Sequence, residues 1–346
     1  MRAQSALVTG YPNFVVKRLV ERLTSDGQTC WVLCKSDYED EAHSYFAGNK
    51  RVRLISGDVV AMDLGLSGKE VKALRDDVAV VYHLAGRYYL GTKEEEMERV
   101  NVDGTRNLLA FAAELPSLDR LVHYSTAFVA GNREGVIMED ELLWPQKFRN
   151  AFEATKFKAE RIVRQTMDDL PISVVRPSLV VGDSRTGEID HMDGPHFFMH
   201  VLVNLPLDIH LPLLGKGVYP LNLVPVDFVV EAMAGIAGDS RAVGKTFHLV
   251  DPNPLPSRAV FEHICRAANK KPPRRSIPSN LATVLMKMPG LEKHWRSPRL
   301  FVEYLNQLVL YNWMNTLEIL NNTEVMCPPF PSYVDKLVAF LKSKKR

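Results

Sequence analysis

Short apolar segments alternate with amphipathic segments over the first half of the chain, and this alternation is the strongest constraint on the fold. The expected strands are nearly all apolar and cover residues 5–9, 29–34, 51–56, 78–84, 120–125 and 172–176. The expected helices lie between them, over residues 14–23, 68–74, 101–113 and 152–167. Strands without polar alternation are typical of a parallel sheet covered by helices on both faces. The pattern therefore predicts an α/β fold with a Rossmann-like, doubly wound parallel sheet, whose ligand lies at the carboxyl ends of the strands.

The alternation weakens after about residue 185, where the chain changes character. Residues 196–214 are apolar and interrupted by prolines, and residues 281–315 are rich in Leu, Met and aromatic side chains, which predicts helices. Residues 333–344 predict a final amphipathic helix. We therefore expect a dinucleotide-binding domain over residues 1–185. The remaining residues, 186–346, are expected to form a smaller, mostly helical substrate-side region that is interleaved with the first domain.

Composition excludes several classes of function. The 43 Lys and Arg residues nearly balance the 41 Asp and Glu residues, giving a net charge of +2, which argues against a nucleic-acid surface. The four cysteines have no metal-ligand spacing, so we expect no metal site. No signal peptide is recognisable and no apolar run reaches the ~18 residues that span a bilayer. We expect a cytoplasmic protein without a transmembrane segment.

Several motifs occur in order between residues 5 and 255. They are Gly57-Asp58, His83-Leu84-Ala85-Gly86, Asn101-Val102-Asp103-Gly104-Thr105, Ser125-Thr126-Ala127, Arg176-Pro177-Ser178 and Val224-Pro225-Val226-Asp227. In this order and spacing they resemble the extended short-chain dehydrogenases/reductases of the epimerase/dehydratase type. The resemblance is closest to the thioester-reductase and fatty acyl-CoA reductase-like branch. It implies an NAD(P)H-dependent oxidoreductase acting on acyl thioesters, alcohols or carbonyls, and homodimers are usual in this superfamily.

The turn after the first strand departs from the family pattern. Three glycines spaced three residues apart normally allow a tight turn and a close approach to the cofactor pyrophosphate. Here Gly10 is kept, but Asn13 and Val16 replace the second and third glycines. Asn tolerates a positive φ, so the second position is expected to keep its turn, whereas Val16 is expected to push the helix away from the strand or the phosphate. We expect weakened nucleotide binding, with an empty cleft as the alternative.

The end of the second expected strand indicates which dinucleotide is preferred. NAD-binding relatives carry an acidic residue there, but this chain has Lys35, whose charge suits a 2′-phosphate. Asp58 follows the third expected strand and is a candidate acceptor for the adenine amino group. We therefore expect NADP(H) in preference to NAD(H), with no cofactor as the alternative. The resemblance implies that the cofactor would lie against Thr9, Gly10, Asn13, Phe14, Lys35, Asp58, Val59, Leu84, Ala85, Lys156 and Pro177.

The resemblance places a phenylalanine at the family's catalytic tyrosine. In the family, a tyrosine four residues before a lysine transfers the proton that accompanies hydride transfer, and positions i and i+4 share one helix face. The lysine is Lys156 here, but the tyrosine position is Phe152, which has no ionisable proton. Thr126 stands at the family's catalytic Ser/Thr position and would bind the carbonyl oxygen, while Lys156 would hold the nicotinamide ribose.

Other side chains are candidates to replace the missing phenol. They are Tyr88, Tyr89 and Tyr124 near expected strand ends, and His196 after the substrate-side loop. Packing against the core is the simpler interpretation of each tyrosine, and burial is the simpler interpretation of His123.

Three functions remain open from the sequence. The first is a divergent protein that binds NADP(H), and an acyl ligand or a protein partner, with weak or no turnover in a sensing or regulatory role. The second is an active NADP(H)-dependent reductase of an acyl thioester or other lipophilic carbonyl. The third is a protein-interaction scaffold, in which the basic segments 270–275 and 342–346 contact an acidic partner or an anionic membrane.

Overall fold

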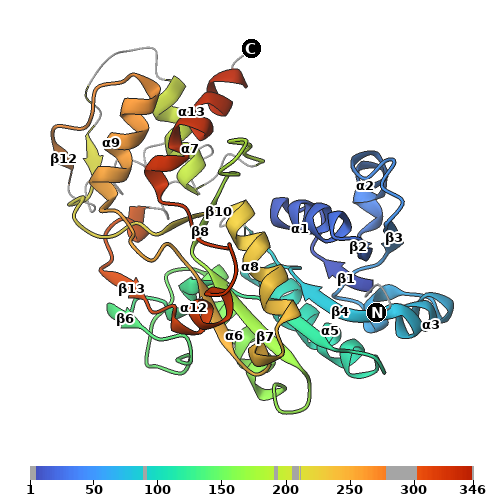
Figure 1. The fold of residues 1–346 in the computed structure, drawn as a ribbon. Coiled ribbons are helices and arrows are strands. Elements are labelled where there is room, and N and C mark those ends of the chain that lie inside the picture. The colour runs from blue at the N-terminus through green and yellow to red at the C-terminus, as the bar shows by residue number, and fades with distance from the viewer. Residues whose placement is uncertain are drawn as a thin grey trace.

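The computed structural model describes residues 5–88, 92–190, 194–204, 210, 212–277 and 302–344. Its centre is a seven-stranded parallel sheet in the order β11-β7-β5-β4-β1-β2-β3 (Figure 1). The strands are β1 Ser5–Thr9, β2 Thr29–Cys34, β3 Val52–Ser56, β4 Val78–His83, β5 Arg120–Tyr124, β7 Ile172–Pro177 and β11 Thr246–Leu249. The chain runs from β1 outward to β3, then returns to β4 and runs outward in the opposite direction. The predicted Rossmann-like, doubly wound sheet is confirmed.

Helices cover both faces of this sheet. One face carries α1 Phe14–Ser25, α2 Glu39–Tyr45, α8 Val226–Gly238 and α12 Met314–Leu320. The other face carries α3 Gly68–Asp77, α5 Gly104–Ala113 and α6 Ala151–Gln165, with the short α4 Glu94–Glu98 against α6. Neighbouring residues of one strand enter different cores: Leu7 packs with the second group of helices and Val8 with the first. Because both sides of each strand are buried, the strands are apolar without alternation.

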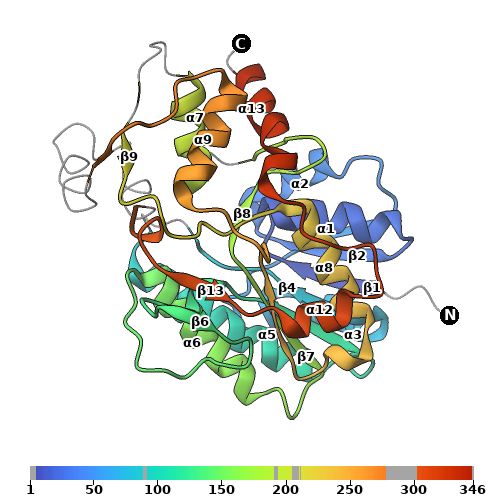
Figure 2. The same cartoon turned by 60° about the vertical axis from the view of Figure 1, so that its left-hand side comes forward.

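A third core forms beyond the carboxyl ends of the strands. It packs α7 Gly194–Asn204, α9 Ser257–Ala268 and α13 Val334–Ser343 together, and Figure 2 shows these helices gathered at one end of the molecule. Three small parallel pairs lie outside the main sheet. They are β8 Leu179–Val181 with β10 Leu223–Pro225, β9 Leu213–Leu214 with β12 Ser276–Ile277, and β6 Gly135–Ile137 with β13 Val309–Tyr311.

The second half of the chain differs from its expected pattern in several places. β11 and α8 extend and cover the main sheet, and the sequence pattern missed both of them. Residues 281–301 of the expected helical stretch lie outside the described residues. Within its described part, residues 309–311 form β13, so the helical prediction is wrong there because these residues pair with the distant β6. The final helix is confirmed as α13. The division near residue 185 stays a prediction.

Candidate functional site

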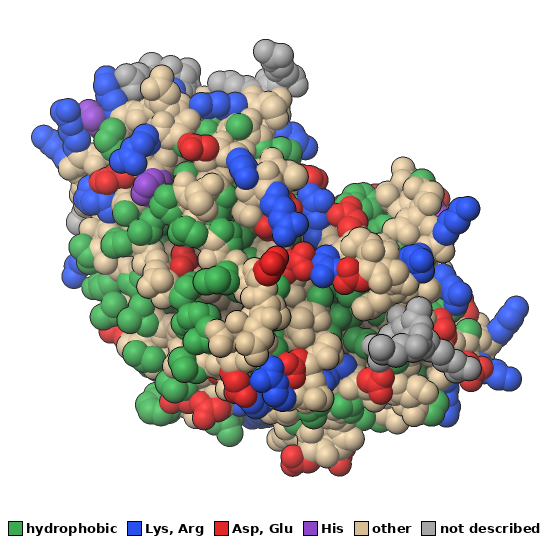
Figure 3. Space-filling view, viewed as in Figure 1, with side chains coloured by type: hydrophobic (Ala, Val, Ile, Leu, Met, Phe, Trp, Pro, Cys, Tyr) green, Lys and Arg blue, Asp and Glu red, His purple; other side chains and the backbone are tan. Residues whose placement is uncertain are grey.

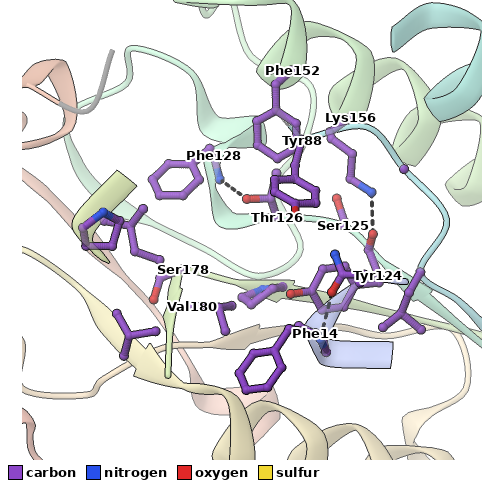
Figure 4. Close-up of a pocket in the computed structure, with 18 of the residues that line it drawn as sticks. Phe14, Tyr88, Tyr124, Ser125, Thr126, Phe128, Phe152, Lys156, Ser178 and Val180 are labelled. Carbon is purple, nitrogen blue, oxygen red and sulfur yellow. Dashed lines mark hydrogen bonds between the residues drawn. The ribbon is translucent and has the colours of Figure 1, made fainter. Parts of the chain in front are cut away.

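A cavity of about 240 Å³ lies at the carboxyl ends of β5 and β7, and Thr126, Phe152 and Lys156 all line it. Phe152 and Lys156 come from the same face of α6, and Thr126 comes from the turn after β5 (Figure 4). Phe14 and Val180 form part of the opposite wall. The structure therefore brings the three predicted catalytic positions together in one cavity, which we call the α6 pocket.

The Lys156 side chain is buried at the wall of the α6 pocket. Its ammonium group donates a hydrogen bond of 2.5 Å to the carbonyl oxygen of Tyr124, and the residue is only 6 % exposed. Burial lowers the pKa of Lys156 to about 8, although the Glu160 carboxylate acts in the opposite direction. The amine is thus held in place at the α6 pocket, and its contact with a ribose stays a prediction.

The side chain of Thr126 takes part in a local hydrogen bond. Its side-chain oxygen accepts a hydrogen bond of 3.3 Å from the backbone N–H of Phe128 and caps the short helix that follows. An accepting hydroxyl keeps its own proton for another partner, so Thr126 can donate to an oxygen in the pocket. The neighbouring Ser125 instead donates to the buried Glu160 carboxylate at 2.5 Å and does not offer that proton to a ligand.

Among the phenol groups around the α6 pocket, those of Tyr304 and Tyr124 have raised pKa values and are poor proton donors. Tyr304 donates its hydroxyl proton to Glu153 at 2.8 Å, and burial together with the Glu153 charge raises its pKa well above the usual range. Burial also raises the pKa of Tyr124. Tyr88 lies at the pocket wall beside Phe152, and Tyr89 lies outside the described residues. Sequence reasoning missed Tyr304, because no motif connects the C-terminal part of the chain with α6.

A buried polar network fixes α6 against the sheet. Asn101 donates a hydrogen bond of 2.9 Å to the side-chain oxygen of Thr155 and accepts one of 2.7 Å from the backbone of Arg87. Farther along α6, Glu160 pairs with the fully buried Arg176 at 2.6 Å. Burial alone would raise the pKa of Glu160, but Arg176, Arg164 and the hydrogen bond from Ser125 together outweigh it and lower that pKa to about 2. The scaffold of the site is thus intact around Phe152.

The turn between β1 and α1 differs from the expectation. Gly10 has a φ of +106°, and a Cβ atom there would lie 2.6 Å from the backbone of Leu84, so only glycine fits. Asn13 has a φ of −55° and not a positive one. Its side-chain oxygen caps α1 by accepting a hydrogen bond of 2.8 Å from the backbone N–H of Val15. Val16 is completely buried in the core, so its branched side chain is accommodated.

A second cavity of about 190 Å³ lies along the ends of β1, β2 and β3, and we call it the β2 pocket. Its lining includes the predicted residues Gly10, Asn13, Lys35, Asp58, Val59 and Ala85. Lys35 and Asp58 form an ion pair of 2.5 Å, and about a third of each side chain is exposed. The two residues predicted to read the adenosine end therefore contact each other.

The two pockets are neighbours and share part of their lining. Asn13, Gly86, Arg87 and Tyr88 line both of them. Of the other predicted cofactor residues, Phe14, Leu84 and Pro177 line the α6 pocket. Thr9 lines neither, because its completely buried hydroxyl bonds to His83 at 2.9 Å and accepts from the backbone of Ala85 at 3.2 Å.

The two candidate histidines, His196 and His123, lie in different surroundings. His196 lines the α6 pocket, as the sequence suggested. His123 lies fully buried beside His83, and burial lowers its pKa well below the usual value, so it stays neutral. In the part of the chain that the structure describes, no group of three or more His, Cys, Asp or Glu side chains is placed to hold a metal ion.

Comparison with known proteins identifies the family. The sequence profile of the family described as "Male sterility protein" matches residues 8–233, about two thirds of the chain. The chain belongs to this family. The match extends from β1 into α8 and includes the lining of the β2 pocket and, apart from Tyr304, that of the α6 pocket. The fold is accordingly the NAD(P)-binding fold of extended short-chain dehydrogenases/reductases, in the branch of the acyl-CoA and thioester reductases.

The relatives agree with this assignment. A fatty acyl-CoA reductase of Drosophila melanogaster is 29% identical over 217 residues, which are 55% of this chain and 41% of that protein. A putative fatty acyl-CoA reductase of the same fly is 26% identical, over 74% of this chain and 60% of its own length. The chain thus spans about half the length of these relatives. The terminal R domain of the myxalamid pathway has the same fold, with a TM-score of 0.83, 24% identity, and coverage of 99% of this chain and 91% of that one.

Within the described ranges, no helix is both long enough and apolar enough to cross a membrane.

Proposed function

We propose that this protein binds NADP(H) along the cleft formed by the two pockets and has little or no oxidoreductase turnover. The observation that carries the proposal is the position of Phe152, which faces the α6 pocket beside Thr126 and Lys156. A reductase needs a proton donor at this place, and a phenyl ring cannot supply one. The rest of the framework supports binding, because α6 is anchored by its buried network and the two pockets share part of their lining.

Charge at the β2 pocket supports NADP(H) over NAD(H). Lys35 is the cation at the end of β2, where a 2′-phosphate would be read. Asp58 forms an ion pair with the Lys35 ammonium group, so a bound 2′-phosphate must compete with a carboxylate. The preference is therefore expected to be modest.

Titration with NADPH and NADH tests this proposal directly. We expect NADPH to increase nicotinamide fluorescence and raise the melting temperature at micromolar concentration, and NADH to do so more weakly. The Gly10→Val variant is the matched control, because a Cβ atom at position 10 would collide with the backbone of Leu84. Absence of binding to either nucleotide at millimolar concentration would contradict the proposal. Rapid turnover of a carbonyl by the wild-type protein would contradict its second part.

An active reductase of a lipophilic carbonyl is the second candidate, and the apolar wall of the α6 pocket favours it. The wall is formed largely by Phe14, Phe128, Leu179, Val180 and Val181. In this function Thr126 would polarise the carbonyl oxygen, and a water molecule would supply the proton. Turnover of acyl thioesters or long-chain aldehydes that Lys156→Ala abolishes would favour this second candidate.

A further inference from the structure

An exposed apolar surface lies over β6 and β13, away from the cleft. Its members are large hydrophobic side chains that are 44% to 72% exposed: Val136, Leu143, Trp144, Leu308, Leu310 and Met314. We call it the β6–β13 face. Figure 3 shows hydrophobic side chains gathered over this part of the molecule. A contiguous apolar surface of this kind marks a site of association with a protein or a membrane.

The β6–β13 face is fixed by the fold. Val136 and Leu310 are direct partners in the parallel pairing of the two strands, so their side chains lie on the same side. Ile137, the next residue of β6, points inward and is 1% exposed. The guanidinium of Arg133 lies 4.4 Å from the ring centre of Trp144 and also binds Glu141 at 2.6 Å. The tryptophan is therefore supported at the surface and does not fold into the core.

Basic side chains adjoin the β6–β13 face. The end of α9 and the connection to β12 carry Arg266, Lys270, Lys271, Arg274 and Arg275, most of them exposed. Figure 3 shows Lys and Arg side chains on the same view of the molecule, above the apolar area. Two exposed acidic residues, Glu134 and Asp140, flank β6, one directly before the strand and the other three residues after it. The surface thus combines an apolar area with a basic cluster beyond it, and only two acidic side chains border β6.

We propose that the β6–β13 face binds the surface of an anionic lipid bilayer. Aromatic and aliphatic side chains enter the boundary between headgroups and acyl chains, and nearby Lys and Arg residues are attracted by anionic headgroups.

The same segment connects the face to the α6 pocket. Tyr304 lines that pocket and lies a few residues before Leu308 and β13, and its ring packs on Phe128, a further residue of the pocket, at 4.6 Å. Membrane binding would bring this wall of the pocket close to the bilayer. The proposal does not depend on nucleotide binding or on turnover.

Vesicle sedimentation tests the proposal, with phosphatidylcholine vesicles that contain or lack phosphatidylserine. We expect the wild-type protein to bind the anionic vesicles more tightly, by about 10-fold or more at low ionic strength, and to dissociate as salt is added. Leu143→Ser/Trp144→Ser removes apolar anchors and is expected to weaken binding by about 10- to 100-fold. Arg274→Glu/Arg275→Glu is expected to weaken it by at least about 10-fold.

Matched variants on other surfaces separate this effect from general changes. Met62 and Met326 are 84% and 77% exposed, and Lys69 and Lys72 are exposed on α3, far from the face. Met62→Ser/Met326→Ser and Lys69→Glu/Lys72→Glu should therefore leave binding within about twofold. Unchanged melting temperatures would show that all four variants are folded.

Three results would overturn the proposal. The first is absence of sedimentation with anionic vesicles. The second is equal binding of wild type and Leu143→Ser/Trp144→Ser. The third is a dimer in sedimentation velocity that this double variant converts to a monomer without any vesicle binding, which would assign the face to a second copy of the chain.

Discussion

The two ends of the cleft have lost their expected residues in different ways. At the β2 pocket, Asn13 replaces a glycine and forms a new hydrogen bond with the N–H of Val15. In the α6 pocket, Phe152 replaces a tyrosine and brings no polar group at all. Asn13 accepts a hydrogen bond from the N-terminus of α1, where it would compete with a phosphate. Phe152, by contrast, only removes the hydroxyl group that would transfer a proton. Nucleotide affinity and turnover are therefore expected to be restored by separate changes.

Restoring the phenol should have the largest effect. In Phe152→Tyr the new hydroxyl would lie four residues before Lys156, on the same face of α6. We expect turnover of aldehydes or acyl thioesters with NADPH to rise by ~10²–10⁴, the usual contribution of general acid–base catalysis. The measurement is NADPH oxidation followed by absorbance, and Phe152→Leu is the control. Equal rates in the wild type and Phe152→Tyr would mean that the missing proton donor is not what limits the α6 pocket.

The pH dependence of stability tests whether the ammonium group of Lys156 is buried at the α6 pocket. The folded-state pKa of Lys156 is about 8, below the ordinary value of 10.5, so the unfolded chain binds more protons between these two pH values. Stability contributed by this group must then rise with pH across the window. We expect the free energy of unfolding of wild type relative to Lys156→Met to increase by roughly 3 kcal/mol between pH 8 and pH 10.5, measured by denaturant titration.

An exposed lysine on the same helix gives the matched control for this pH effect. Lys158 is largely exposed and pairs with Glu98 at 3.0 Å. Lys158→Met should show no comparable change with pH. A flat difference between wild type and Lys156→Met would mean that the ammonium group is better solvated than its burial suggests.

At the β2 pocket, loss of the cation should affect one nucleotide more than the other. We expect Lys35→Ala to weaken NADPH binding by about 5- to 10-fold and to leave NADH binding nearly unchanged, since only the 2′-phosphate needs the charge. Asp58→Asn removes the competing carboxylate and should tighten NADPH binding instead. Isothermal titration of the variants checks both. A parallel loss for both nucleotides after Lys35→Ala would assign Lys35 a structural role.

The smallest change is expected at the turn. Asn13→Gly frees the N–H of Val15 for a phosphate, so we expect both dinucleotides to bind about 3- to 10-fold more tightly. The lost cap should cost only a few tenths of a kcal/mol, because glycine is tolerated at this position. Asn13→Ala is the control, since it also frees the N–H but costs about 1 kcal/mol of stability. Weaker binding in Asn13→Gly would mean that the asparagine contacts the nucleotide itself.

The main sheet was more predictable than the parts added to it. β1 and β2 have the bounds that the apolar runs indicated, because each run ends at a glycine or a charged residue. The expected helix over residues 101–113 instead contains a π-helical turn, Arg99–Asp103, before α5. β13 was expected to be helical, since its strand character depends on pairing with β6, about 170 residues away.

The candidate site was likewise predicted only in part from the sequence. Thr126, Phe152 and Lys156 were named from a motif, and the structure places all three around the α6 pocket. Tyr304 was missed, although it forms part of the same wall. The pairing of Lys35 with Asp58 was missed as well, because two residues that each suit a ligand can also suit one another.

By itself, the sequence determined the doubly wound sheet, the family, and the absence of a phenol at position 152. These depend on local patterns of burial and on the residue at a motif position, which can be recognised along the chain. Only the tertiary structure decided that Asn13 caps its own helix, that Tyr304 closes the α6 pocket, and that six apolar side chains share an exposed face. Each of these features depends on backbone geometry or on contacts between distant segments, and neither is encoded in a local periodicity.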